Sequence, residues 1–172
     1  MDEPNTRVGW GFDAHRFGPV GSIVLCGVEV DRDRGIEATS DGDVAAHAVM
    51  DALLGAAGLG DLGDHFAEDD PAMRGADSME LLTQVMSLVE GASYRLGNVD
   101  LTVVAQTVRI APHREAMRAA LAKALAVDIG AVSVKATTTD GMGAIGADEG
   151  LAVAAVVLLF NRASRPSGLD RR

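Results

Sequence analysis

The stretch RVGWGFDAHRF, residues 7–17, alternates in side-chain character from one position to the next. A period of two is typical of a β-strand, whose successive side chains point to opposite faces of the sheet. Asp13 and His15 therefore lie on one face of the predicted strand. Both side chains are costly to bury without a partner. They are either solvated residues or two ligands of a metal site, and the segments that pack beside them decide between these alternatives.

A helix is predicted to begin after a cluster of capping residues that ends with Asp43, and to run until several glycines interrupt its Ala- and Leu-rich sequence. Asp43, His47 and Asp51 are four residues apart and share one face of this helix. With Asp13 and His15, His47 would complete an Asp/His/His set typical of catalytic zinc sites. Asp51 could then hold the free ring nitrogen of a ligand histidine. The alternative is a solvated helix face, the commoner environment of a single helical histidine.

The remaining segments alternate between strand and helix patterns. Strands are predicted over 22–30, 94–108 and 131–140, a buried strand or helix over 151–160, and helices over 78–92, with Ser78 as cap, and 111–125, with Pro112 near the first turn. An acidic loop is predicted at 66–77 and a Gly-rich loop at 141–150. No repeat or linker divides the chain. We expect one α/β (α+β) domain over residues 1–160 and a disordered tail over 161–172.

Composition excludes several classes of function. The formal net charge of −10 over 172 residues argues against nucleic-acid binding, because nucleic-acid phosphates need Lys and Arg partners. A phosphorylated small molecule remains compatible if metal ions supply positive charge. The single cysteine, Cys26, has no disulfide partner and is expected to be buried and inert. The longest apolar run, residues 151–160, is about half the length that spans a bilayer, and residues 1–7 lack a signal-peptide pattern, so we expect a cytoplasmic protein.

The segment KATTTD, residues 135–140, places three hydroxyls and a carboxylate at the end of a predicted strand. Three threonines before an aspartate and a Gly-rich loop indicate a corner that binds phosphate and metal. Asp140 offers the hard oxygen ligand that Mg²⁺ or Mn²⁺ prefers. Because the threonines separate the strand from GMGAIG, residues 141–146, a dinucleotide site is not favoured. No Ser–His–Asp or Cys–His pair emerges, and His65 and His113 are expected at the surface.

Seven segments, taken together, carry a resemblance. They are GFDAHRF, TSDGDVAAHAVMDALLGAAGLGDLGDHF, DDPAMRGADS, LGNVDLTVVAQ, APHREAMR, VKATTTD and GADEGLA, between about residues 6 and 160. Their order and spacing resemble the 2-C-methyl-D-erythritol 2,4-cyclodiphosphate synthase family. The resemblance implies a mixed four-stranded sheet flanked by helices, in a homotrimer whose sheets face the threefold axis and whose active sites lie at subunit interfaces. It also implies conversion of 4-diphosphocytidyl-2-C-methyl-D-erythritol 2-phosphate to the cyclodiphosphate with release of CMP, in the non-mevalonate isoprenoid pathway.

The resemblance also assigns roles to individual residues. It places zinc on Asp13, His15 and His47, a second divalent ion (Mg²⁺ or Mn²⁺) on Asp140, and phosphate hydrogen bonds that assist catalysis on Thr39 and Thr138. The methylerythritol side of the substrate would be bounded by Asp61, Leu62, Gly63 and a loop of Phe66, Ala67, Glu68, Asp69 and Asp70. The cytidine pocket would be formed by Ala105, Gln106, Thr107, Val108, Arg109, Ile110 and Ala111 together with Thr137, Thr138 and Thr139. Further substrate contacts would come from Asp13, Ala14, His15, Thr39, Ser40, Asp140, Ala144 and Ala147.

Several positions depart from the residues usual in the family, including the segment FAEDDP, residues 66–71, where FPDTDP is usual. Thr39 stands where a phosphate-positioning histidine is usual, Asp140 where glutamate is usual, and Ala144 and Ala147 where an aromatic residue and an arginine are usual. Two other functions therefore stay open: a zinc-dependent phosphohydrolase that acts on another diphosphate, and a non-catalytic trimer that binds a nucleotide or an isoprenoid diphosphate. Retention of all three zinc ligands favours an enzyme over a purely binding protein.

Overall fold

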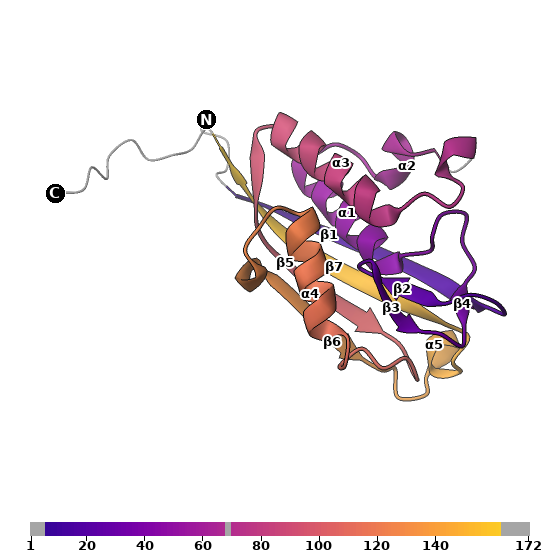
Figure 1. Ribbon diagram of the computed structural model, residues 1–172. Coiled ribbons are helices and arrows are strands. Elements are labelled where there is room, and N and C mark those ends of the chain that lie inside the picture. The colour runs from indigo at the N-terminus through magenta and orange to yellow at the C-terminus, as the bar shows by residue number, and fades with distance from the viewer. Residues whose placement is uncertain (1–5, 68–69, 163–172) are drawn as a thin grey trace.

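Four long strands and one two-residue strand form the mixed sheet of the computed structural model, which describes residues 6–67 and 70–162 (Figure 1). In spatial order they are β4 (Gly35–Ile36), β1 (Thr6–Gly18), β7 (Gly150–Asn161), β5 (Tyr94–Val104) and β6 (Val132–Thr137). Among the described pairs of this sheet, β5 and β6 run parallel and the others antiparallel. The expected α/β domain with a mixed sheet is confirmed. The family resemblance implied four strands, and the structure adds the two-residue strand β4 at one edge of the sheet.

The strand β7 lies at the centre of the sheet and pairs with β1 on one side and β5 on the other. Val153, for example, lies opposite both Asp13 and Val103. A strand that has neighbours on both edges and helices packed on one face buries most of its side chains, which explains the continuous apolar run of residues 151–160. The sequence was compatible with either a strand or a helix over residues 151–160, and the structure shows a strand.

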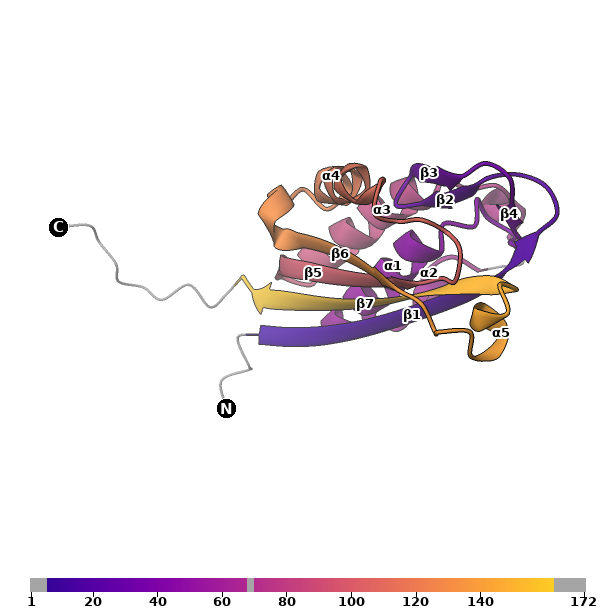
Figure 2. The ribbon, with the colours of Figure 1, turned by 90° about the horizontal axis from the view of Figure 1, so that it is seen from below.

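Three helices cover one face of the sheet (Figure 2): α1 (Val44–Ala57), α3 (Ser78–Gly91) and α4 (Arg114–Ala124). The short helix α2 (Leu62–His65) follows α1, and α5 (Gly143–Gly146) precedes β7. Over the described residues, the opposite face of the sheet carries none of the three long helices (Figure 2). No helix in the described part of the chain is long and apolar enough to span a membrane.

Two glycines bring α1 directly onto the backbone of β1. A Cβ atom on Gly9 would lie 1.9 Å from the carbonyl oxygen of Ala52, and one on Gly11 would lie 2.1 Å from that of Ala48. A side chain at either position would therefore push the helix off the strand. This close approach sets the separation between β1 and His47 on α1.

The segment predicted as one strand over 22–30 is instead a hairpin of β2 (Ile23–Leu25) and β3 (Val28–Asp31). Cys26 and Gly27 form its turn, with φ angles of 54° and 70°. Their N–H groups donate to the Asp43 carboxylate at 2.9 and 2.7 Å, while the same carboxylate caps α1 as predicted. The prediction was wrong because a turn held by a distant side chain leaves no signal in the local apolar pattern. Cys26 is fully buried as expected, and burial, followed by the charge of Asp43, raises the pKa of its thiol.

The first residues of the other two long helices differ from the prediction. Asp77, and not Ser78, caps α3, because the Asp77 carboxylate accepts hydrogen bonds from the N–H groups of the first turn. Ser78 is the first helical residue and its hydroxyl bonds elsewhere. The helix α4 begins after His113, later than the predicted start at position 111, and Pro112 lies just before its first turn. A short 3₁₀ turn, Ile129–Ala131, leads from α4 to β6.

Strand ends also differ from the prediction. The strand β5 ends at Val104 and β6 at Thr137, so residues 105–108 and 138–140 lie in loops. The predicted loops contain short helical turns: Pro71–Met73 in the acidic loop and α5 in the Gly-rich loop.

The predicted tail begins too early. The strand β7 continues through Asn161, and Arg162 Nη2 donates to Glu90 Oε1 at 2.8 Å, so both residues belong to the domain. The remainder of the predicted tail, 163–172, lies outside the described residues, as do residues 1–5 of the predicted domain.

Candidate active site and metal centre

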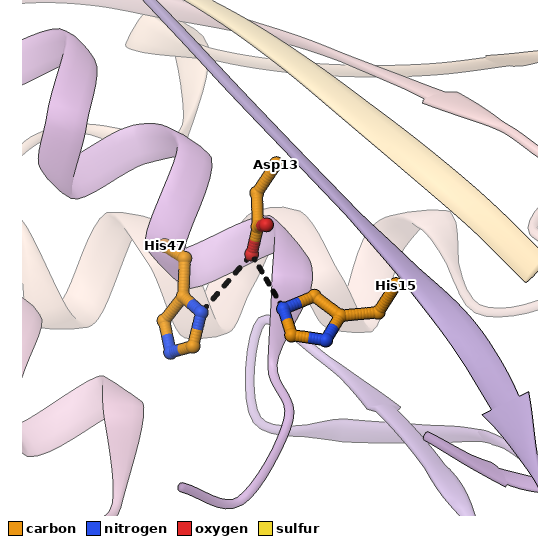
Figure 3. Close-up of side chains that lie close together, drawn as sticks. All are labelled: Asp13, His15 and His47. Carbon is orange, nitrogen blue, oxygen red and sulfur yellow. Dashed lines mark hydrogen bonds and ion pairs between the residues drawn. The ribbon is translucent and has the colours of Figure 1, made fainter. Parts of the chain in front are cut away.

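Asp13, His15 and His47 converge where β1 passes the first turn of α1 (Figure 3). Asp13 Oδ2 lies 3.3 Å from His15 Nε2 and 3.1 Å from His47 Nδ1. One ligand atom from each residue lies within 4.8 Å of the other two. We call these three residues the metal triad. The convergence that strand alternation and helix spacing predicted is confirmed.

The ring nitrogens that face away from Asp13 contact other oxygen atoms. His15 Nδ1 lies 2.8 Å from the carbonyl oxygen of Glu37, which can only accept, so Nδ1 carries the hydrogen. In the neutral ring, Nε2 of His15 then presents its lone pair toward Asp13. His47 Nε2 lies 3.0 Å from Ser78 Oγ and 3.3 Å from Ser40 Oγ. Sequence reasoning missed Glu37 because a backbone carbonyl leaves no trace in a side-chain pattern.

Asp13 supplies the anionic member of the triad. Burial would raise the pKa of its carboxyl group, but hydrogen bonds and charge interactions with His15 and His47 outweigh burial and hold that pKa well below its usual range. The group is therefore ionised at neutral pH. One carboxylate oxygen and two imidazole nitrogens form a donor set that Zn²⁺ accepts, so the residues present fit this ion.

Asp51 does not take the expected place beside a ligand histidine. Its Oδ1 accepts a hydrogen bond from the N–H of Leu62 at 2.8 Å, which ties α1 to the start of α2. Burial raises the pKa of Asp51, and the Leu62 N–H opposes that rise. Glu37 and Ser78 contact the outer ring nitrogens instead. The expectation was wrong because helical spacing gives the face of a residue but not the direction or reach of its side chain.

A cavity of about 330 Å³ opens beside the metal triad. Its wall consists of Phe12, Asp13, His15, Ala38, Thr39, Ser40, His47, Asp51, Leu62, Gly63, Phe66, Met73 and Leu81. The structure thus brings the expected Thr39 and Ser40, together with the start of α2, to the triad. Sequence reasoning missed Phe12, Ala38, Met73 and Leu81, because an apolar side chain carries no mark in the sequence that separates a cavity wall from the rest of the fold.

Other residues expected to contact the substrate have local roles. Asp61 caps α2 in a reciprocal capping box. Ala14 N–H donates to Asp13 Oδ1 at 2.8 Å. Asp70 N–H donates to the carbonyl oxygen of exposed Ala67 at 3.0 Å. Glu68 and Asp69, which the family resemblance also implicated, lie outside the described residues.

The second polar group is the threonine corner, defined as Thr137, Thr138, Thr139 and Asp140. Thr138 Oγ1 donates to Asp140 Oδ1 at 3.0 Å and accepts from Asp140 N–H at 3.1 Å, and Asp140 has a φ angle of 51°. Thr139 Oγ1 donates to the carbonyl oxygen of Met142 at 2.7 Å. The corner begins with the last residue of β6, and β5 and β7 separate β6 from β1. None of the residues of the threonine corner lines the cavity beside the metal triad. Within one chain, the residues expected to bind cytidine and those expected to bind zinc therefore do not form one site.

The segment expected to contact cytidine, residues 105–111, is fastened to the Gly-rich loop. Thr107 Oγ1 donates to Asp148 Oδ1 at 2.8 Å, and Arg34 donates to Thr107 Oγ1 and to Asp148 Oδ2, both at 2.7 Å. Gln106 Oε1 accepts from Gly141 N–H at 3.3 Å. Sequence reasoning missed Arg34, which lies far from both partners along the chain. The exposed Ala144 and Ala147 lie at the short helix α5.

Ala105, Val108 and Ile110 are buried, and Arg109 and Ala111 are exposed. The segment 105–111 therefore alternates between core contacts and outward side chains. The buried side chains anchor its backbone to the domain, while the exposed ones remain accessible to a ligand.

Known proteins resemble the chain over nearly its whole length. The sequence model of the YgbB family matches residues 6–160. A relative from Shewanella sp. (strain W3-18-1), named 2-C-methyl-D-erythritol 2,4-cyclodiphosphate synthase, is 52% identical over 156 residues, which cover 91% of this chain and 97% of the relative. A relative of the same name from Ectopseudomonas mendocina is 52% identical over 153 residues, 89% of this chain and 98% of the relative.

Solved structures share the fold. The bifunctional IspDF from Campylobacter jejuni matches with a TM-score of 0.88 and 42% identity over 91% of this chain, which spans 42% of that longer protein. IspF of Plasmodium falciparum, solved as a CDP complex, matches with a TM-score of 0.81 and 29% identity, over 93% of this chain and 99% of that one. The chain therefore belongs to the YgbB family, the family of the 2-C-methyl-D-erythritol 2,4-cyclodiphosphate synthases.

Proposed function

We propose that this chain converts 4-diphosphocytidyl-2-C-methyl-D-erythritol 2-phosphate to 2-C-methyl-D-erythritol 2,4-cyclodiphosphate and CMP, as a phosphorus–oxygen lyase of the non-mevalonate isoprenoid pathway. The observation that carries this proposal is the metal triad on the wall of a cavity, in a chain 52% identical to named synthases. The CDP-bound structure of a family member supports a cytidine diphosphate as ligand.

The reaction requires no nucleophile from the protein. An oxygen of the substrate's 2-phosphate forms a bond to the β-phosphorus, the bond from that phosphorus to the oxygen shared with the α-phosphate breaks, and CMP leaves with the shared oxygen. Both reacting groups belong to one molecule, so the protein contributes mainly by holding them in line. We assign orientation of the phosphate side to the cavity residues Thr39 and Ser40, and orientation of the cytidine side to residues 105–111.

Metal ions fit the charge of this substrate. We propose that Asp13, His15 and His47 hold Zn²⁺ and that Asp140 holds Mg²⁺ or Mn²⁺. When bound, these ions offset the charge that develops on the transferring phosphoryl group. The ionised Asp13 is ready for this role without proton loss. The contact of His15 Nδ1 with the carbonyl oxygen of Glu37 leaves Nε2 as the ring nitrogen that faces the site. Thr39 and Thr138 then donate hydrogen bonds to phosphate oxygens, a role for which the Thr39 hydroxyl replaces the imidazole usual in the family.

We propose that the active protein is a homotrimer with a site at each subunit interface. The face of the sheet opposite the long helices exposes apolar side chains: Val8 is 70% exposed, Trp10 64% and Phe12 48%. Association of such faces buries this surface. Because the threonine corner and the metal triad lie apart in one chain, a neighbouring copy would bring them together. Light scattering should give a mass three times 17.8 kDa, and a monomeric mass at working concentration would contradict the proposal.

Phosphorus NMR tests the reaction directly. Purified full-length protein is incubated with the cytidylyl 2-phosphate substrate, Zn²⁺ and Mg²⁺. The expected products are CMP and the cyclic diphosphate in equal amounts. A linear phosphate product would instead support the phosphohydrolase. Unchanged substrate with saturable CDP binding would support the non-catalytic binding protein.

A pair of histidine variants ties the reaction to the triad. His47→Ala should abolish both stoichiometric zinc and product formation. His113→Ala removes the same side chain at the start of α4, where it makes no capping hydrogen bond, and should retain both. Full zinc content in His47→Ala would overturn the ligand assignment.

A further inference from the structure

A buried serine connects His47 to a second aspartate. Ser78, the first residue of α3, has no exposed surface. Its Oγ donates to Asp41 Oδ1 at 2.5 Å, and its backbone N–H donates to Asp41 Oδ2 at 2.9 Å. The same Oγ lies 3.0 Å from His47 Nε2. Asp41 therefore accepts two hydrogen bonds from Ser78, and these hold the Ser78 hydroxyl next to Nε2 of His47.

The position of one hydrogen follows from this arrangement. A hydroxyl group has one hydrogen to donate, and a carboxylate can only accept. If Ser78 donated its hydrogen to His47, the lone pairs of Ser78 and Asp41 would face each other across 2.5 Å. The hydrogen therefore goes to Asp41, and the Ser78 oxygen accepts from His47. It follows that His47 Nε2 carries a hydrogen.

We propose that Asp41, acting through Ser78, fixes His47 in the tautomer protonated at Nε2 and so presents the lone pair of Nδ1 to the metal. Asp41 and Ser78 are positioning residues and touch neither substrate nor metal. Ser40 Oγ, at 3.3 Å from the same nitrogen, is a longer second acceptor. The inference deepens the proposed function, because it rests on His47 being a metal ligand.

The backbone around Asp41 shows how this position is held. Asp41 N–H donates to the carbonyl oxygen of Ala76, and Gly75 N–H donates to that of Thr39 at 3.1 Å. The segment before α1 is thus hydrogen-bonded to the segment before α3. Asp41 Oδ1 also accepts from Asp43 N–H at 3.1 Å, so the carboxylate is fixed relative to the start of α1. His47 and its acceptor consequently belong to one connected framework.

The test measures zinc affinity of the full-length protein by competition with a chelator, independently of turnover. Ser78→Ala and Asp41→Asn should each weaken zinc binding by about 10- to 100-fold, the usual effect of losing a partner of a metal ligand. Asp41→Asn can turn its amide toward Ser78, which releases the serine hydrogen to His47 and favours the wrong tautomer. In the Ser78→Ala background Asp41→Asn should therefore change the affinity less than twofold. Independent, additive effects would overturn the proposal.

A spectroscopic measurement separates tautomer from general loosening. Nitrogen NMR of the zinc-loaded wild type should show His47 protonated at Nε2 and metal-bound at Nδ1, and protonation at Nδ1 would overturn the proposal. The matched control is Asp77→Ala, which removes the cap of the same helix one residue away and should leave zinc affinity within twofold. An equal loss in Asp77→Ala would also overturn it. If the wild-type protein binds no zinc, the proposed metal site itself is refuted. If wild type and Ser78→Ala bind zinc equally well, only the role of Asp41 and Ser78 is refuted.

Discussion

The metal triad and the threonine corner are organised in different ways. The triad joins a strand to a helix whose backbones are in direct contact through Gly9 and Gly11, and its histidines are held by Glu37 and Ser78. The threonine corner starts at the last residue of β6, and its side chains bond mainly to one another and to nearby backbone. Packing therefore fixes the triad, whereas local hydrogen bonds shape the corner.

This difference has a chemical consequence. The triad can receive an ion with its donors already aimed at one point, so little conformational freedom is lost on binding. The Thr138 hydroxyl must instead leave Asp140, or share its hydrogen bond, before it can donate to a phosphate. We therefore expect substitutions in the triad to remove metal and activity together, and substitutions in the corner to reduce turnover while leaving zinc in place.

Asp13→Asn should have the largest effect. The neutral amide oxygen is a poorer ligand than the carboxylate, and the charge that attracts the ion is lost. Because a bound metal is worth several kcal/mol of transition-state stabilisation, kcat/KM should fall by about 10³-fold or more, with zinc content falling in parallel. Metal analysis and kinetics of the purified variant measure both. Asp33→Asn, at an exposed carboxylate after β3, should change neither. Full zinc in Asp13→Asn would remove the contrast between the two regions.

Thr138→Ala should reduce turnover by at most about 10²-fold, the lower end of the range for loss of one donor to a transition-state oxygen, because this hydroxyl must first leave Asp140. Zinc content should stay at the wild-type value, because the corner does not contribute to the triad. Thr83→Ala on α3, whose hydroxyl donates only to the helix backbone in this structure, is the control and should keep full turnover. Loss of zinc in Thr138→Ala would show that the two regions are coupled more tightly than the fold of one chain implies.

Strand alternation and helix spacing identified the three residues of the metal triad as candidate ligands but left a solvated face open, and the family resemblance assigned zinc to them. Asp13 and His15 lie two apart on a strand, and His47 lies in the first turn of the helix packed on it, so local periodicity determines the face of each. The groups that hold the rings could not be predicted in this way. Glu37 contributes a backbone carbonyl, and Ser78 reaches His47 only because α3 begins beside α1. Asp51, predicted for this role from spacing alone, bonds to Leu62.

The fold shows the same division between local and long-range information. Long elements such as β1 and α1 follow from period and capping residues. The hairpin at Cys26 depends on Asp43, and the tie between residues 105–111 and the Gly-rich loop depends on Arg34. Each is a contact between segments distant in sequence, and a single chain without aligned relatives carries no signal for it.

Gly11→Ala should destabilise the framework that positions the triad. The new Cβ would overlap the Ala48 carbonyl oxygen, and separating α1 from β1 should lower the free energy of unfolding by about 1–3 kcal/mol. Gly55→Ala is the matched control, because nothing lies within 4 Å of its Cβ and the position is helical, so a gain of about 0.5–1 kcal/mol is expected. Denaturant unfolding measures both. Equal stability of the two variants would show that close packing does not fix the triad.

Asp43 should make the same framework sensitive to pH. Burial raises the pKa of its carboxyl group to about 6, although three backbone N–H groups oppose the rise. The folded state thus binds this proton more tightly than the unfolded state, whose carboxyl retains a value near 3.8. Lowering the pH from 7 to 5 should therefore stabilise the fold through Asp43 by about 1 kcal/mol, and this gain is lost as the pH rises through about 6.

The comparison of wild type with Asp43→Asn isolates this contribution, because other titrating groups are common to both proteins. The free energy of unfolding of both proteins is measured in denaturant at pH 5, 6 and 7. Relative to Asp43→Asn, the wild type should become more stable by about 1 kcal/mol as the pH falls from 7 to 5. A difference that stays constant with pH would show that the three N–H donors, and not burial, set the titration of Asp43.

Arg34→Gln should have the smallest effect. It should act on residues 105–111, which are hydrogen-bonded to the threonine corner and to the loop after it. It removes the guanidinium that fastens Thr107 to Asp148, so residues 105–111 lose part of their preorganisation. Titration with CDP should show affinity reduced by roughly threefold to tenfold. Zinc affinity should not change, because none of the partners of Arg34 lies in the triad. Arg32→Gln, which removes an exposed arginine paired with Glu29, should bind CDP as the wild type does. Unchanged CDP affinity in Arg34→Gln would mean that the buried Ala105, Val108 and Ile110 suffice to hold residues 105–111. Packing would then organise this segment as it organises the metal triad.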